Sequence, residues 1–385
     1  MRSRIAIGAL CVAVVLLVWF VIGRQPSHAG VTIGVLLPTT GTNASIGKPA
    51  LNGIQLAVNQ ANRMRPPGDQ INIKVEDTAA DPSVAIQAFH KLSDFIHPVA
   101  IIGPLTSGES VSLLPWLPKY GIPIVSPGAS SASLDHKKDL FFRVELSDRI
   151  GGQKQAEIAA RQLGSRNISI LYISNEYGQG LASVLKTKFE SFGGTVVDSI
   201  PFPAGTTDFR PILMRIARSK ADMIIPIGID ELVNIIQQAR QLNVRQTIFT
   251  TPIFGNQNYL QQLGEGAEGV YFVYYGSFDI DSHDRIAQTF LNAYKGAYGE
   301  NPTYYSALGY DAAEEIIHAI EASGKYPNRD TITRELQSGG TLHGVTGDLV
   351  MDEYGDVDKP VALKRVVQQK FVLVDSVTAQ TTEAN

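Results

Sequence analysis

Short apolar runs alternate with amphipathic segments along most of the chain. Strands are predicted where β-branched residues gather in runs too short for a helix, at 31–37, 71–75, 101–102, 123–125, 168–174, 195–200, 223–227, 247–251, 270–274 and 361–374. Apolar residues at helical spacing predict helices at 50–62, 180–192, 208–219, 231–242, 286–298, 307–323 and 330–338, and a further helix opens at Pro82 behind Asp81. The alternation occurs twice, which predicts an α/β fold with two doubly wound parallel sheets.

Two of the predicted strands run into loops of small and polar residues. Residues 103–109 read Gly-Pro-Leu-Thr-Ser-Gly-Glu, and residues 126–131 read Ser-Pro-Gly-Ala-Ser-Ser. Ligands of open α/β sheets bind in the crevice beyond the carboxyl ends of the strands, so these loops are candidates for holding one small polar molecule. Structural roles remain open beside this one, with Ser107 as a helix N-cap and Ser130 as a turn hydroxyl.

The first residues predict export. Arg2 and Arg4 precede an apolar run over 5–23, and residues 27–29 offer small side chains at the positions that a signal peptidase reads. We expect residues 1–29 to be a signal peptide, with an uncleaved membrane anchor as the alternative because the run nearly reaches spanning length. The remainder is then periplasmic or extracytoplasmic, and a short tail at 377–385 is expected to be disordered.

Composition narrows the function further. The single cysteine, Cys11, lies in the predicted signal, so the mature chain has neither a disulfide nor a cysteine-based metal site. A net charge of −4 with interspersed signs offers no basic face for nucleic acid. The remaining chain is too long for one ordinary domain, so two lobes are expected.

Enzymatic readings find little support. The histidines are isolated, without spacing suited to zinc, and no Gly-x-Ser-x-Gly, Walker or dinucleotide-binding motif is present. The loop at 103–108 lacks the lysine of a nucleotide-binding loop. We therefore expect a binding protein that is not an enzyme and has neither a cofactor nor a metal.

From residue 30 onward the chain resembles the type I periplasmic substrate-binding proteins of branched-chain-amino-acid ABC transporters. The resemblance rests on the order and spacing of motifs, which are Gly34 to Pro38 with Gly41, Gly53 to Ala57, Ile102-Gly103-Pro104 with Ser107, Pro123 to Ser130, Phe142-Arg143 with Asp148, Glu176 to Gly180, and Gly309 to Ala312. It implies two lobes joined by three crossings that close on a ligand, and an ABC permease as partner.

The resemblance also assigns roles to single residues. It implies that Ser107 and Ser130 give hydroxyl and N–H groups to a ligand carboxylate, that the Gly128 carbonyl receives an amine, and that Tyr177 covers the ligand on closure. This sequence departs from the family pattern in the second lobe, where amino-acid binders of the family carry an acidic residue that pairs with the ligand ammonium. Here Ile253-Phe254 and Ile229-Asp230 stand instead, which favours an apolar wall. Asp230 or Glu231 restoring that charge, and Asp230 as a helix N-cap, are the alternatives.

The sequence thus predicts a monomeric solute-binding protein for an organic acid, an amino acid or an amide. A membrane-anchored sensor of the same fold is the alternative function. With crossings near Ser147, Gly276 and residues 344–347, the first lobe is expected over 30–147 and 277–345, and the second over 148–276 and 346–376. Because the second-lobe wall reads as apolar, an organic or aromatic acid is the expected ligand rather than leucine, isoleucine or valine.

Overall fold

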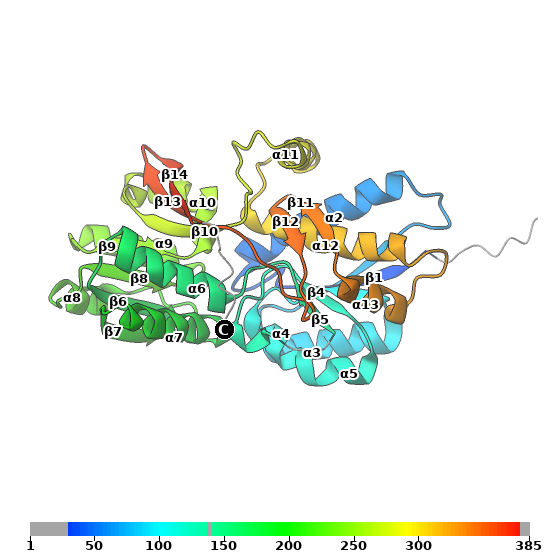
Figure 1. Ribbon diagram of the computed structural model, residues 1–385, viewed down its shortest axis with the longest axis horizontal. Coiled ribbons are helices and arrows are strands. Elements are labelled where there is room, and N and C mark those ends of the chain that lie inside the picture. The colour runs from blue at the N-terminus through cyan, green and yellow to red at the C-terminus, as the bar shows by residue number, and fades with distance from the viewer. Residues whose placement is uncertain (1–29, 137–139, 378–385) are drawn as a thin grey trace, which may run out of the picture.

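The computed structural model describes residues 30–136 and 140–377, which form two α/β lobes side by side (Figure 1). The first lobe holds a parallel five-stranded sheet in the order β2 (Asn72–Asp77), β1 (Thr32–Leu37), β3 (Ala100–Ile102), β4 (Ile124–Ser126) and β5 (Phe141–Arg143). The second holds a seven-stranded sheet in the order β14 (Lys370–Val377), β13 (Val361–Val367), β10 (Tyr271–Tyr275), β9 (Thr247–Thr250), β8 (Met223–Ile227), β6 (Asn167–Ile173) and β7 (Thr195–Phe202). The predicted α/β class is confirmed.

Helices lie on both faces of each sheet, as the alternating pattern predicts. Those of the first lobe are α2 (Ala44–Arg63), α3 (Pro82–Lys91), α4 (Ser107–Leu113), α5 (Leu117–Tyr120), α11 (Arg285–Tyr298), α12 (Tyr304–Ala322) and α13 (Arg329–Ser338). Those of the second are α6 (Asp148–Glu157), α7 (Glu176–Ser191), α8 (Arg210–Ala217), α9 (Glu231–Gln241) and α10 (Gln257–Leu263). Residues from the last third of the chain therefore complete the first lobe.

Two glycines let α2 and α12 pack at close range. A Cβ on Gly53 would lie 2.0 Å from the Ser306 carbonyl oxygen, and one on Gly309 would lie 2.2 Å from the Ala50 carbonyl oxygen. This contact joins the start of the chain to a helix some 250 residues later, which ties the first lobe together.

We expect Gly53→Ala to destabilise the protein by about 2 kcal/mol or more, because the methyl group must push two helix backbones apart. Thermal unfolding monitored by circular dichroism measures the loss. Gly296→Ala in α11, where an added Cβ meets nothing within 4 Å, is the matched control and should keep or raise the unfolding temperature. An unchanged unfolding temperature in Gly53→Ala would contradict the close packing.

The chain passes between the lobes three times. The first passage follows β5 and enters α6, and the second lies at Gly276 after β10. The third differs from the expected position at 344–347. There, β11 (Thr341–Gly344) and β12 (Gly347–Val350) form a hairpin, and Gly355 then packs against Phe142 of the first lobe. The chain reaches the second sheet only at Val361, because the glycines at 344 and 347 serve a tight hairpin turn instead of a hinge.

The last strand-like segment is a hairpin rather than one strand. β13 runs antiparallel to both β10 and β14, so the second sheet is mixed at this edge. The turn uses Gln368 and Gln369 at φ 50° and 60°. Among the described residues, none of the helices is both long and apolar enough to cross a membrane. The predicted signal at 1–29 and nearly all of the predicted tail lie outside the described residues.

Candidate functional site

A pocket of about 130 Å³ lies between the lobes, beyond the carboxyl ends of their strands. Its first-lobe side is formed by Asn43, Ile46, Ala80, Pro82, Leu105, Thr106, Ser107, Gly108, Gly128, Ser130, Glu145 and Tyr305. Its other side is formed by Asp148, Asn175, Tyr177, Ile229, Pro252, Ile253 and Tyr275. Since an engineered cavity of about 150 Å³ accepts benzene, the size suits a molecule of one ring or a short branched chain.

The two serine-containing loops are fastened to each other. The Ser126 hydroxyl donates to the Pro104 carbonyl at 2.6 Å and accepts from the Ala129 N–H at 3.1 Å. Ser107 Oγ accepts from the N–H groups of Ser130 and Ser131, at 3.2 and 3.1 Å. The Ser107 hydroxyl proton therefore remains available to a ligand, whereas the Ser130 N–H is already used. The predicted role of Ser130 is corrected in this respect, because its amide supports the loop.

Glu145 and Asp148 bring two carboxyl groups into the pocket, and sequence reasoning did not select either as a site residue. Glu145 follows β5, and its Oε1 accepts from the Leu146 N–H at 2.8 Å and the Tyr304 hydroxyl at 3.0 Å. Asp148 opens α6, and its Oδ2 accepts from the Ser130 hydroxyl at 3.0 Å. The predicted apolar wall concerned only the second-lobe loops at Ile229 and Ile253, and these two carboxyl groups come from the passage between the lobes instead.

Burial dominates the protonation of Asp148. It raises the pKa of the Asp148 carboxyl to about 8, with Glu145 and Asp135 adding repulsion while the Ser130 hydrogen bond and Arg143 oppose the shift. Burial also raises the pKa of Glu145, against the attraction of Lys359. An empty pocket therefore tends to keep a proton on Asp148 at neutral pH.

The second-lobe residues divide into two groups. Tyr177 in the first turn of α7, Ile229 after β8 and Ile253 after β9 line the pocket, so its second-lobe wall is largely apolar. Phe254 does not line it and is corrected to a core residue. It is fully buried and stacks on Tyr259 at a centroid distance of 5.9 Å, because the 3₁₀ turn Pro252–Gly255 directs it inward.

Asp230 lies at the rim of the cleft rather than in the pocket, which corrects its predicted contact with a ligand. It accepts from the Ser45 hydroxyl at 2.5 Å and the Asn43 N–H at 3.4 Å, both in the first lobe. It makes no side-chain cap to α9. Glu231 is also committed elsewhere, since it accepts from the N–H groups of Gly205 and Ile229 at 2.8 and 3.2 Å.

A second contact spans the cleft at α7. Glu176 Oε1 accepts from the hydroxyls of Ser131 and Ser133 at 3.0 and 2.7 Å. Two second-lobe carboxylates, those of Asp230 and Glu176, thus accept hydrogen bonds from first-lobe hydroxyls. The two lobes are therefore in direct contact across the cleft.

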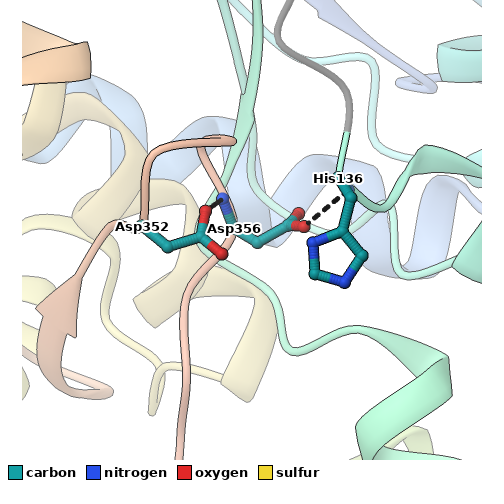
Figure 2. Close-up of side chains that lie close together, drawn as sticks. All are labelled: His136, Asp352 and Asp356. Atoms are coloured by element: carbon teal, nitrogen blue, oxygen red, sulfur yellow. Dashed lines mark hydrogen bonds between the residues drawn. The ribbon is translucent and has the colours of Figure 1, made fainter.

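Beneath the pocket, the buried Arg143 connects three segments. Its Nε donates to Asp356 Oδ1 at 2.8 Å and its Nη1 donates to the Ser131 carbonyl at 3.1 Å, while Nη2 pairs with Asp135. Figure 2 shows Asp356 beside His136 and Asp352, with the His136 N–H donating to Asp356 Oδ2 at 3.2 Å and the Asp356 N–H donating to Asp352. These carboxylates therefore fasten the 352–356 turn to the first lobe.

Two α/β lobes with a pocket between them define a bilobal fold of the type I periplasmic binding-protein class. The sequence profile of the periplasmic binding protein family matches residues 30–370, so the chain belongs to that family. A Leu/Ile/Val-binding protein of Rhizobium johnstonii is 26% identical over 338 residues, covering 86% of this chain and 90% of that protein. The predicted branched-chain-amino-acid type is confirmed.

Solved structures agree with this assignment. A leucine-binding protein from Thermotoga maritima superposes with a TM-score of 0.83 at 27% identity, covering 91% of this chain and 99% of that one. A solute-binding protein of an ABC transporter from Rhodopseudomonas palustris, solved with benzoate, has a TM-score of 0.83 at 20% identity and covers 91% and 96%. At that identity the second likeness shows the fold alone.

Proposed function

We propose that this protein is the extracytoplasmic binding component of an ABC transporter, which encloses one small molecule in the interlobe pocket and delivers it to a permease. The observation that carries the proposal is the pocket between the lobes, which has largely apolar walls and a few polar groups. Ser107, Gly128 and Ser130 are its first-lobe contacts, and Tyr177, Ile229 and Ile253 cover the ligand on closure. Relatives named for leucine, isoleucine and valine support a ligand of that size.

The mechanism follows from the contacts at the rim. The ligand binds first to the more polar first lobe, and closure then buries its apolar body against the second-lobe wall. Each apolar Å² removed from water contributes about 25 cal/mol. The Asp230 and Glu176 hydrogen bonds stabilise only the closed form, so ligand and rim contacts act together to populate it.

A thermal-shift screen of amino acids, amines, amides and small organic acids tests the proposal. A ligand present at one hundred times its dissociation constant should add about 2.7 kcal/mol of stability. A screen in which none of these compounds raises the unfolding temperature of protein freed of bound ligand by unfolding and refolding would contradict it.

The rim contact at Asp230 gives a second test. We expect Asp230→Asn to weaken ligand binding by about 1 kcal/mol, mainly through faster dissociation, because the closed form loses an ionic hydrogen bond to Ser45. Stopped-flow fluorescence measures the rate. Glu265→Gln, a change on the exposed surface of the same lobe, is the control. If Ser45→Ala and Asp230→Asn prove additive in a double-mutant cycle, the rim contact has no role in closure.

A further inference from the structure

The pocket has an acidic end with free acceptor atoms. The hydrogen bonds of Glu145 go to Oε1 and that of Asp148 goes to Oδ2. Glu145 Oε2 and Asp148 Oδ1 receive no hydrogen bond from the residues that the structure describes. Both side chains are more than nine-tenths buried, and both line the pocket. A ligand that fills the pocket displaces the water there, and a carboxylate oxygen that lines the pocket then needs a donor from the ligand.

Neighbouring bases do not supply that donor. The Arg143 guanidinium donates hydrogen bonds to Asp356, to the Ser131 carbonyl and to Asp135. The buried Lys359 donates to Thr346 Oγ1 at 2.7 Å, and its charge is shared between Glu145 and Asp311. Neither base lines the pocket. The acidic end therefore keeps an excess of carboxyl groups over cations.

A third group at this end is also without a partner. The Tyr275 hydroxyl is buried, lines the pocket and makes no hydrogen bond. It lies against Gly151 of α6, where a Cβ would come within 2.2 Å of the hydroxyl oxygen, so the ring cannot move toward the helix to find one. A buried hydroxyl without a partner destabilises the empty protein, and a ligand group that reaches it would remove this cost.

Resting on the proposed function, we propose that the ligand presents a protonated nitrogen to Glu145 and Asp148, with the Tyr275 hydroxyl as a further acceptor. An ammonium or amidinium group offers several N–H donors, which matches the three free acceptors on the segment after β5, on α6 and on β10. The apolar body of the ligand then lies against Ile229 and Ile253. An organic acid without nitrogen offers no N–H donor to these acceptors and brings a further negative charge beside Glu145, so we expect it to bind more weakly than the amine.

Matched compounds that differ only in charge test this inference by isothermal titration calorimetry at pH 7.5. The probes are leucine, 3-methylbutylamine and 4-methylpentanoate, with benzylamine and benzoate as an aromatic pair. We expect binding by one or more of the amine-bearing compounds and none by the two acids. If only an acid binds, the inference is overturned while the proposed function stands. If none of the five binds, the inference is overturned as well, and the wider screen described above decides the proposed function separately.

Variants of Glu145 and Asp148 test whether these side chains bind the ligand nitrogen. Glu145→Gln and Asp148→Asn should each weaken binding of the amine at least about tenfold. Glu157→Gln, the same change at the far end of α6 and outside the pocket, should leave it unchanged. Equal affinity in Asp148→Asn and the parent would overturn the inference.

A measurement on the unaltered protein keeps the test independent of folding. The groups that act on Asp148 are Ser130, Arg143, Glu145 and Asp135, together with Tyr177, Tyr275 and Tyr305, whose raised pKa values keep them neutral. Because a cation needs Asp148 ionised, binding at pH 7 should release a proton, seen as a dependence of the heat on buffer ionisation enthalpy. Affinity should rise up to about tenfold per pH unit toward pH 8. Proton uptake, or an affinity that falls over this range, would overturn the inference.

Discussion

Replacing Ser107 by alanine is expected to destabilise the ligand-free protein by about 2–4 kcal/mol and to weaken ligand binding further. The Ser107 hydroxyl accepts two buried backbone N–H groups, from Ser130 and Ser131, and each loses its partner in the variant. The loop after β4 then loses its fastening to α4, and with it the placement of Gly128. Urea unfolding measures the first effect and calorimetry measures the second.

Ser112→Ala provides the comparison within the same helix. The Ser112 hydroxyl donates to the Glu109 carbonyl at 2.6 Å and lies outside the pocket, so this variant should lose less than about 1 kcal/mol and keep its affinity. Equal unfolding free energies for the two variants would show that the loops are held by something other than Ser107.

The second large effect is a change in the pH dependence of stability. The pKa of the Asp148 carboxyl is about 8 in the folded protein, above its ordinary value of 3.8. Between these values the folded state holds a proton that the unfolded state releases, so this group makes the parent less stable as the pH rises through that window. Asp148→Asn removes this slope, and we expect the variant to gain about 4 kcal/mol relative to the parent between pH 5 and pH 9.

Thermal and urea unfolding of ligand-free protein at pH 5, 7 and 9 measure this difference. Glu157→Gln is the control, since its carboxylate is paired on the surface with Lys154 and Arg161. A stability difference between Asp148→Asn and the parent that stays constant with pH would mean that Asp148 is ionised throughout the range. Stabilisation together with loss of ligand binding is typical of a group kept for function.

Local pattern was enough for the fold class and for the two strand-end loops on the first-lobe side of the pocket. Ser107, Gly128 and Ser130 follow β-branched runs, and the edge of a parallel sheet gathers such strand ends wherever the strands lie. The hairpin of β13 and β14 left no such signal, because its turn uses Gln368 and Gln369 in the left-handed region instead of glycine or asparagine. The third crossing lies later in the chain than predicted. The glycines at 344 and 347 are typical of a hinge, but here they belong to the β11–β12 hairpin.

The acidic end of the pocket needed the tertiary structure. Glu145 and Asp148 stand in the passage between the lobes, where the segment 144–147 is neither strand nor helix and periodicity gives no direction for a side chain. Asp148 follows the N-cap Ser147, so a carboxylate there also suits the start of any helix. A signal did exist in the resemblance, which includes Asp148 after Phe142-Arg143. Its place in the pocket depends on Ser130, and no local rule connects the two residues.

Small-angle X-ray scattering tests the central claim, that the lobes close around a ligand, most directly. Protein freed of bound ligand by unfolding and refolding is compared with protein saturated by the tightest compound of the screen. We expect the radius of gyration to decrease on saturation, and to decrease less in a variant that combines Asp230→Asn with Glu176→Gln and so lacks both rim carboxylates. An unchanged radius of gyration, with saturation verified by calorimetry on the same sample, would contradict closure.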